Sequence, residues 1–556
     1  MDKRTILAFA LSFAVLVGWS LFFGPKPDST RENDKTSPPA EETPAHVTKA
    51  PAVSTPAPTP AKKEAVKETP PVNVPQAGEQ LIEVETPLYK ATLSNVGPTF
   101  KSFKLKKYRE TTNPDAPLIE LVRQNAPDRP FLGINFYPEA HGSNPIKTFR
   151  VDEDRMVLSP ESPPRELVFT TTTEDGISSQ HTYRFYPDHY RIDLHVDVAN
   201  RTENPLKGIF NAWVNAKLPA DKGGYYAYAG LAALLNNELE EVELEDPGEV
   251  KQLSGKVGWL AYEDSYFILA IVPDIPTDAL IKGRMVESGL VEGRYLPPAT
   301  DINPGEQASV KYELYLGPRD LGVMKDFGRG LDKAINFGWT DIIAKPLLVV
   351  LRFFDRYIHN YGVSIILLTI LVKILFWPLT HKSYKSMKEM QKLQPMMAKI
   401  REKYKNDKQK LNQEMMGLYK TYKVNPMGGC LPMVIQIPVF FALFRVLGNC
   451  IELRHAPFML WINDLSAPDR LFHFPFSIPF MTPPYGIPVL TLLMGASMFL
   501  QQKMTPTPGD PTQAKIMMFL PIIFTFMFIN FPSGLVLYWL VNNLLSIGQQ
   551  YRIHKK

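Results

Sequence analysis

The sequence has little cysteine and lacks the common motifs of catalysis. Its 556 residues include two cysteines, Cys430 and Cys450, on either side of an apolar run. As a helix, that run would hold the two residues about 30 Å apart, too far for a disulfide. The sequence also contains no GxxxxGK[ST] phosphate loop, no HExxH, no paired CxxC and no GxSxG. We therefore expect no disulfide framework, no metal site and no cofactor.

The chain also lacks a strong net charge. Lys and Arg total 61 against 57 Asp and Glu, which gives a formal charge of +4. This excess is too small to indicate a nucleic-acid partner. No internal repeat recurs at a fixed period. The location of the charges therefore carries more information than their sum, and the apolar residues are concentrated at the two ends of the chain.

The N-terminus is apolar behind a basic flank. Lys3 and Arg4 precede a mostly apolar stretch over residues 6–23. A signal peptide is one interpretation, but the stretch is longer than a usual signal core and no small-x-small cleavage site follows it. We expect an uncleaved anchor over 1–24 with its N-terminus in the cytoplasm. Residues 25–78 are rich in Pro, Ala, Thr, Lys and Glu, which predicts a disordered tether.

Residues 79–320 show a two-residue hydrophobic period. In YRIDLHVDV (190–198), apolar residues alternate with charged ones, and VKYELYL (310–316) repeats the pattern. Such alternation is typical of half-buried strands. Many of these runs, separated by Pro, Gly, Asn and Asp, predict one large antiparallel β-sandwich. If the anchor runs outward from the cytoplasm, this domain lies on the far side of the membrane.

Long apolar runs return in the C-terminal part. Residues 321–361 predict a linker and an amphipathic helix in the membrane interface, because charges interrupt their apolar residues. The run 516–547 would be about 48 Å long as one helix, against a hydrocarbon core of about 30 Å. The FPSG sequence in its middle favours a turn between two helices. The predicted spans after the anchor are therefore residues 362–379, 431–449, 487–504, 516–531 and 534–551.

The basic residues agree with this arrangement. Residues 380–430, between the second and third of the six spans, contain twelve Lys or Arg and are predicted to be cytoplasmic. The connection 505–515 and the tail 552–556 are also basic and fall on the same side as the N-terminus. The connection 450–486 falls on the opposite side.

One lysine lies inside a predicted span. A lysine at the centre of a membrane helix is unfavourable by about 2.5 to 3.5 kcal/mol, so Lys373 should face protein or water. It could snorkel toward the cytoplasmic interface. Alternatively, it could share a wet groove with polar residues at a similar depth in other spans, which ordinary interhelical hydrogen bonds could also explain. The candidate groove lining is Thr369, Gln436, Asn542 and Asn543, and Tyr538, Asn542 and Ser546 form a polar stripe on the last span.

The basic cytoplasmic segment is rich in methionine. It is predicted to form two helices broken near Lys405 to Asp407. Flexible methionines suit a surface that accepts varied apolar partners, and the lysines could contact ribosomal RNA or anionic lipid. The alternative is an ordinary helical hairpin that packs its methionines together. The candidate contact residues are Met387, Met390, Met396, Met397, Met415 and Met416.

Three stretches resemble a known family. They are LQPMMAKIREKYKNDKQKLNQEMMGLYKTYKVNPMGGCLPMVIQIPVFFALF, ELRHAPFMLWINDLSAPD and FPSGLVLYWLVNN. They are similar to the YidC family of membrane protein insertases, in its Gram-negative form, from about Phe337 to the end, whereas the N-terminal parts match in layout. The resemblance implies a multi-pass protein of the bacterial inner membrane. Its fold would be a large periplasmic antiparallel β-supersandwich and an α-helical membrane domain, with six transmembrane helices in total, five of them C-terminal, and a cytoplasmic helical hairpin.

The resemblance also implies a function without enzymatic activity or cofactor. The protein would insert, fold and help assemble integral membrane proteins, with or without the Sec translocon. Its partners would be nascent membrane proteins, the Sec translocon with its accessory subunits, the lipid bilayer and, through the basic hairpin and tail, the ribosome, but not DNA. The family's groove carries one positive charge, mostly arginine, and Lys373 stands at that position without arginine's bidentate fork. The implied substrate contacts, besides Thr369, are Ile437, Pro438, Phe440, Tyr538 and Trp539.

Three other functions remain as alternatives. A small-solute or proton-coupled transporter would use Lys373 as its intramembrane site, but transporters often show repeats and midplane sites, and here no repeat is found and the charge is off-centre. An intramembrane serine protease needs facing Ser and His residues, whereas His381 lies at a cytoplasmic end. A periplasmic binding module that is merely anchored would lose all activity without its β-domain.

Overall fold

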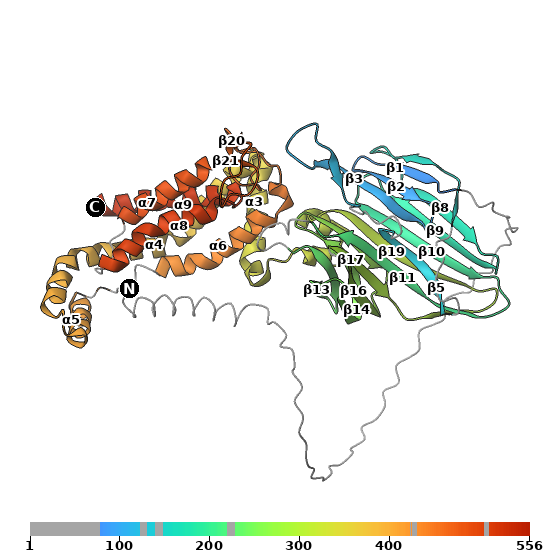
Figure 1. Ribbon diagram of the computed structural model, residues 1–556, viewed down its shortest axis with the longest axis horizontal. Coiled ribbons are helices and arrows are strands. Elements are labelled where there is room, and N and C mark those ends of the chain that lie inside the picture. Colours follow the sequence, from blue (N-terminus) through green and yellow to red (C-terminus); the bar gives the residue numbers. More distant parts are fainter. Residues whose placement is uncertain are drawn as a thin grey trace, which may run out of the picture. The chain divides into compact units, whose positions relative to one another are not determined.

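The structure is a computed structural model of the chain (Figure 1). It describes residues 78–122, 130–139, 148–219, 228–287, 289–422, 424, 431–504 and 511–555. The anchor predicted over 1–24 and nearly all of the tether predicted over 25–78 lie outside the described residues. Cys430 lies outside them as well, whereas Cys450 is a buried free thiol.

A five-stranded sheet contains the first strands of the chain. Its strand order is β4-β3-β2-β1-β7, and every pair is antiparallel except β1 with β7. Its strands are β1 Leu81–Glu85, β2 Tyr89–Ser94, β3 Thr99–Arg109, β4 Leu118–Glu120 and β7 Arg155–Val157.

A larger antiparallel sheet contains fourteen strands of the described residues, in the order β18-β11-β17-β16-β14-β15-β19-β10-β9-β8-β6, with β12, β13 and β5 paired to its side. In β10, Ile192, Leu194 and Val196 are buried and alternate with half-buried polar residues, which confirms the two-residue period. Its strands are β5 Leu132–Pro138, β6 Arg150–Val151, β8 Arg165–Thr172, β9 Ile177–Phe185, β10 Arg191–Asn200, β11 Leu206–Lys217, β12 Gly230–Leu235, β13 Glu238–Val242, β14 Val250–Glu263, β15 Phe267–Pro273, β16 Thr277–Glu287, β17 Leu290–Leu296, β18 Thr300–Ile302 and β19 Gln307–Pro318.

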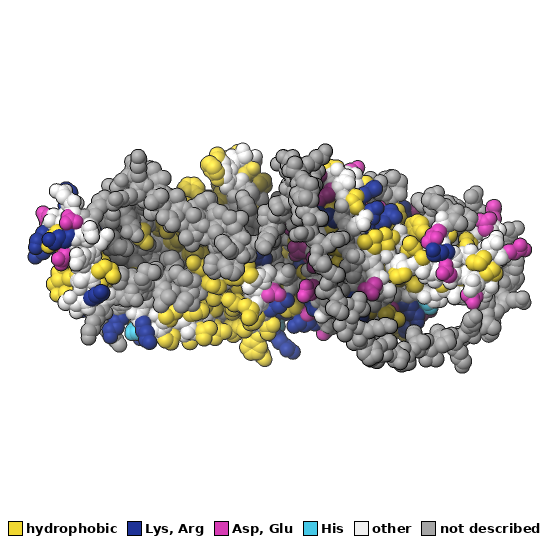
Figure 2. Space-filling view, turned by 90° about the horizontal axis from the view of Figure 1, so that it is seen from below, with side chains coloured by type: hydrophobic (Ala, Val, Ile, Leu, Met, Phe, Trp, Pro, Cys, Tyr) yellow, Lys and Arg dark blue, Asp and Glu magenta, His cyan; other side chains and the backbone are white. Residues whose placement is uncertain are grey.

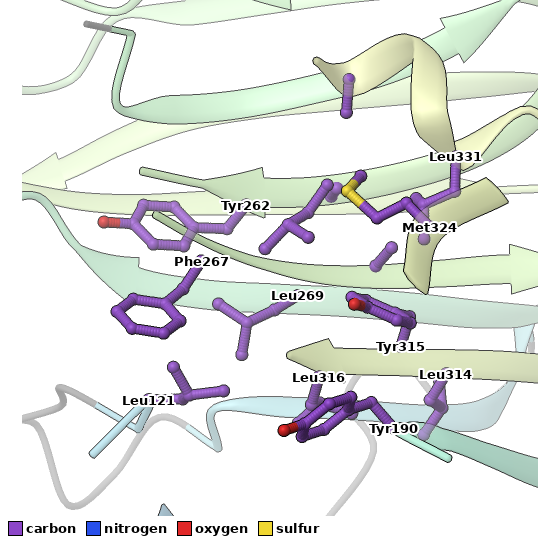
Figure 3. Packing of buried hydrophobic residues seen from close by; sticks show 14 of the residues in the cluster. Leu121, Tyr190, Tyr262, Phe267, Leu269, Leu314, Tyr315, Leu316, Met324 and Leu331 are labelled. Atoms are coloured by element: carbon purple, nitrogen blue, oxygen red, sulfur yellow. The ribbon is translucent and has the colours of Figure 1, made fainter. Parts of the chain in front are cut away.

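The two sheets share a hydrophobic core. Phe100 of the smaller sheet lies edge-on to Tyr183 of the larger one, with ring centroids 6.0 Å apart. Tyr183 also donates a hydrogen bond to the carbonyl of Pro98, so its buried hydroxyl is satisfied. Figure 3 shows another part of this core, where Met324 and Leu331 from the segment after β19 pack over Leu269 and Tyr315.

The segment after β19 begins with helix α2 (Leu321–Phe327), which starts at Asp320. The Asp320 carboxylate accepts hydrogen bonds from the backbone N–H groups of Gly322 and Val323, a typical N-cap. Two short 3₁₀ helices follow, η2 (Leu331–Ala334) and η3 (Gly338–Thr340), and lead into the helical region.

Seven helices of the described residues form the helical region. They are α3 Asp341–Ile358, α4 Tyr361–Lys403, α5 Lys408–Thr421, α6 Leu431–Asn449, α7 Val489–Met504, α8 Pro511–Phe528 and α9 Ser533–Lys555. Hydrophobic side chains gather on their surface, and Lys and Arg cluster at the α5 end (Figure 2). Among the described residues, α4 alone is long and apolar enough to cross a bilayer by length and composition. The six-span arrangement therefore stays a prediction.

Two interruptions between helices lie where the sequence predicted them, whereas the boundary predicted near residue 380 is not the end of a helix. The chain turns between α8 and α9 at the FPSG sequence, and α4 and α5 are separated by residues 404–407. The boundary expected near residue 380 does not exist as a helix end, because α4 runs without interruption through Pro378 and Pro395. The first helix of the predicted hairpin is thus a continuation of the predicted span.

Candidate functional site

Lys373 is buried at a contact between α4 and α9. Its side chain is 7% exposed. The ammonium Nζ donates hydrogen bonds to Asn542 Oδ1 at 2.9 Å and to Ser546 Oγ at 2.7 Å. These acceptors lie one turn apart on α9, so they face Lys373 together. The side chain thus finds its partners inside the protein.

A third helix joins this contact through Gln436 of α6. Gln436 Nε2 donates to Asn542 Oδ1 at 3.0 Å and lies 3.5 Å from the Tyr538 hydroxyl. The amide oxygen of Asn542 therefore accepts hydrogen bonds from both α4 and α6. We call Lys373, Gln436, Tyr538, Asn542 and Ser546 the polar junction.

The charge of the polar junction has no ionic partner. Within residues 341–422, 431–504 and 511–555, none of the salt bridges of the described residues includes Lys373. Asn542 and Ser546 supply neutral oxygens, which solvate an ammonium but do not cancel its charge. An ammonium has three N–H donors, and these two acceptors use two of them. The third N–H remains available to a further acceptor.

Toward the C-termini of α4 and α9, two further pairs of residues link the helices. Gln549 Nε2 donates to Thr380 Oγ1 at 3.0 Å, and Lys388 Nζ donates to the carbonyl of Ile553 at 3.0 Å. Lys373, Thr380 and Lys388 are spaced by seven and eight residues, so they lie along one face of α4. We call these contacts, together with that of Lys373, the polar seam.

Two of the predicted groove residues form hydrogen bonds with groups other than the Lys373 side chain. Thr369 is buried, and its hydroxyl donates to the carbonyl of Ile365 in its own helix at 2.6 Å. Asn543 donates to Ser497 Oγ of α7 at 3.0 Å. Of the predicted lining, the structure therefore places Gln436 and Asn542 at Lys373. Gln549 was not among the predicted site residues, although it extends the stripe of Asn542 and Ser546 along α9.

Aromatic residues pack beside the polar junction. The Phe440 ring lies edge-on to Trp539 at 4.7 Å, which packs α6 against α9. Tyr538 is buried, so it is not free to contact a substrate in this state. Ile437, by contrast, is 45% exposed on α6, and Pro438 is half-buried beside it. Ile437 is thus the most accessible of the predicted substrate contacts.

The methionines of the predicted hairpin divide into two groups. Met397 is buried, with its sulfur 4.0 Å from the Tyr419 hydroxyl of α5. It therefore belongs to the packing of α4 against α5. Met396 and Met416 are exposed. The remaining three, Met387, Met390 and Met415, are half-buried.

No metal centre is present in the part of the chain that the structure describes. No three His, Cys, Asp or Glu side chains of these residues gather in a way that could hold a metal ion.

Two family descriptions match the chain. The family "60Kd inner membrane protein" matches residues 353–556, and "YidC periplasmic domain" matches residues 81–350. Together they cover the large sheet and most of the helical region.

Full-length relatives are similar along the whole chain. The "Membrane protein insertase YidC" of Syntrophus aciditrophicus is 45% identical over 568 residues and covers 100% of both chains. The protein of the same name from Pelobacter propionicus is 42% identical and covers 100% of this chain and 99% of its own length. A crystal structure described as "Active YidC insertase" matches 85% of this chain and 93% of its own, with 18% identity and a TM-score of 0.37.

Proposed function

Because the chain belongs to the YidC family of membrane protein insertases, we propose that it acts on its substrates through the charge of the polar junction. It is an inner-membrane protein with a periplasmic domain, and its function as an insertase implies nascent membrane proteins as substrates. This function is non-enzymatic. The transporter, protease and anchored-module alternatives are set aside, since the family assignment covers the whole chain.

In the proposed mechanism, Lys373 attracts acidic residues that flank an incoming apolar segment. The observation that carries this proposal is a buried ammonium with two neutral acceptors and, among the described residues, no carboxylate partner. A charge is felt more strongly in the low dielectric of such a site than in water. A substrate carboxylate would take the remaining N–H donor and restore electroneutrality for the time that it stays there.

The apolar segment itself would leave between α6 and lipid. The exposed Ile437 and Phe441 on α6 offer an apolar surface beside the polar junction. We propose that the segment slides along this surface after its polar flank has been solvated at Lys373. Burial of about twenty apolar residues in the bilayer supplies the driving force.

The membrane topology belongs to the same proposal. Six spans, with both termini, α5 and the basic tail in the cytoplasm, agree with the clustering of Lys and Arg at the α5 end (Figure 2). The exposed Met396 and Met416 support a first contact with substrate on the cytoplasmic side. The Sec translocon and the ribosome, the latter through the basic hairpin and tail, complete the proposed partners.

Site-specific photo-crosslinking tests this function. A photoreactive residue at Ile437, present while a small membrane protein is being translated, should form an adduct with its transmembrane segment. A matched control places the same residue at Ile275, which is exposed in the β-domain. Equal labelling at both positions, or no adduct from Ile437, would contradict the proposed path.

A further inference from the structure

The connection between α6 and α7 presents large apolar side chains to the outside. We call residues 450–488 the apolar loop; it contains η5 (Ile451–Leu453), β20 (Leu471–Phe474) and β21 (Tyr485–Ile487). Three of its side chains are 67–84% exposed, which is unusual for residues of their size. They are Leu460, Phe472 and Phe480.

The backbone at these three positions is strained. Leu460, Phe472 and Phe480 have φ angles of 58°, 56° and 64°. This left-handed region is disfavoured for all residues except glycine, because Cβ approaches the following carbonyl, and bulky residues rarely adopt it. The chain thus accepts a backbone cost at the very residues whose apolar side chains it exposes. Such a cost persists where another interaction offsets it.

The apolar loop is held firmly to the ends of the helices. Arg470 is buried and donates to the carbonyls of Pro484 and Ile529, at 2.9 Å and 2.8 Å. Asn530, in the turn between α8 and α9, donates to the carbonyl of Phe480 at 2.9 Å. The Phe480 backbone is therefore fixed to the α8–α9 turn, and its side chain has a fixed place relative to the helices.

The surroundings of the apolar loop favour lipid over a protein partner. The part of the loop that carries Phe472 and Phe480, residues 471–488, contains no Asp, Glu, Lys or Arg, whereas the charged residues of the loop lie in its first part, with Leu460. Protein interfaces usually carry a polar rim. The loop is fixed to the turn at the end of α8, a helix on which Phe519, Ile523 and Phe526 are exposed. It also lies at the end of the helical region opposite α5 (Figure 1). Aromatic and apolar side chains without charges are typical of residues that enter a bilayer interface.

We propose that Leu460, Phe472 and Phe480 insert into the periplasmic leaflet of the bilayer and anchor the apolar loop in phospholipid. The left-handed backbone turns these side chains toward the acyl chains, and their burial there offsets the strain.

Spin-label accessibility in liposomes tests the anchor. Phe480→Cys and, separately, Phe472→Cys are made in a Cys430→Ser background. Cys450 is retained because its thiol is buried. The purified full-length protein is labelled with a nitroxide and reconstituted into phosphatidylethanolamine–phosphatidylglycerol vesicles. Collision with oxygen, which concentrates in acyl chains, is compared with collision with a water-soluble nickel chelate. The matched control is Ile275→Cys, an apolar residue that is 74% exposed in the β-domain.

The proposal expects the oxygen-to-nickel ratio at Phe480→Cys and Phe472→Cys to exceed that at Ile275→Cys at least fivefold. The ratio should not change when the protein is diluted tenfold in lipid. Shielding that disappears on dilution would show that a second copy covers the loop and would overturn the proposal. A ratio equal to that of the control would overturn it as well.

Discussion

At the residue scale, the site depends on one amide oxygen. Asn542 Oδ1 accepts from both Lys373 and Gln436, so its chemistry sets the charge balance of the polar junction. The side chain is neutral, which leaves the positive charge of Lys373 available to a substrate. A carboxylate at the same position would occupy the ammonium permanently.

Asn542→Asp should therefore inhibit insertion selectively. The new carboxylate, nearly identical in shape, would lie about 3 Å from the ammonium and compete with acidic residues of the substrate. We expect at least a tenfold loss of insertion for a substrate with an acidic translocated tail, measured by protease protection in inverted vesicles. The same substrate with Asn and Gln in place of its acidic residues is the control, and it should insert normally. Equal loss for both substrates would indicate damage to the fold.

A second residue-scale prediction concerns a carboxyl in the β-domain. Burial raises the pKa of Glu263 from 4.5 to about 7, although Arg319 Nε lies 3.5 Å away and favours the charged form. Between these values the folded state keeps a proton that the unfolded state releases, so the free energy of unfolding falls as pH rises. Above pH 7, Glu263 therefore lowers the free energy of unfolding by about 3 kcal/mol relative to its value below pH 4.5.

Glu263→Gln should remove this dependence. The free energy of unfolding of the variant minus that of the parent should increase by about 3 kcal/mol between pH 4 and pH 8. Chemical denaturation of the β-domain, followed by tryptophan fluorescence, measures this difference. Glu240→Gln, at an exposed position of β13, is the control and should follow the parent. A constant difference across this pH range would refute the assignment.

Three of the residues that the sequence grouped in one groove are neighbours in the structure. Lys373, Gln436 and Asn542 were recognised by their depth in apolar runs, and the structure brings them together. Asn543 was grouped with them but contacts α7, because neighbours on a helix point about 100° apart. Only the packing of helices decides which of two adjacent asparagines faces α4. The Thr369 hydroxyl bonds its own helix, and its place in the groove stays a prediction.

At the element scale, the polar seam fixes α4 against α9. Thr380 and Gln549 are both buried and bond each other. Removing Thr380 leaves the buried Gln549 amide without this acceptor, whereas the Thr380 hydroxyl can still donate to the carbonyls of Phe376 and Trp377, both at 3.1 Å. Removing both side chains avoids the penalty at Gln549. The pair thus allows a double-mutant test of the seam.

Thr380→Val should lower the free energy of unfolding by about 1 kcal/mol, and Gln549→Leu by a similar amount. The double variant should cost less than the sum of the two single ones, because no polar group then remains unpaired. Thermal unfolding in detergent, followed through the helical signal, measures all three. Additive costs would mean that the two side chains do not interact.

The ends of helices could be predicted where turn-forming or helix-capping residues occur in the sequence. FPSG stops the run between α8 and α9, and Asp407 caps α5 by accepting from the backbone of Lys410 at 3.0 Å. The continuity of α4 was not predictable in this way. The hydrophobic run ends near residue 380, but a helix does not need to end where its apolar residues end. Basic residues beyond that point are good helix formers.

At the scale of the whole molecule, composition and hydrophobic period predicted the β-domain and the helical region but not the order of the strands in the large sheet. Alternation identified strands such as β10, yet the pairing of β11 with β5, β17 and β18 joins segments that are far apart in the sequence. Local patterns carry no information on such long-range pairing. The inner-membrane location and the insertase function, by contrast, followed from the resemblance and are shown by relatives that match along the full chain.

The central claim is that one buried positive charge selects the acidic flanks of incoming segments, and replacement of Lys373 tests it most directly. Insertion is measured for one substrate with an acidic translocated tail and for its uncharged counterpart, with Lys373→Arg and Lys373→Met. We expect Lys373→Arg to insert both, and Lys373→Met to lose at least tenfold for the acidic tail while the uncharged one still inserts. If Lys373→Met inserts both substrates as well as the parent, the charge has no role in recognition and the account is wrong.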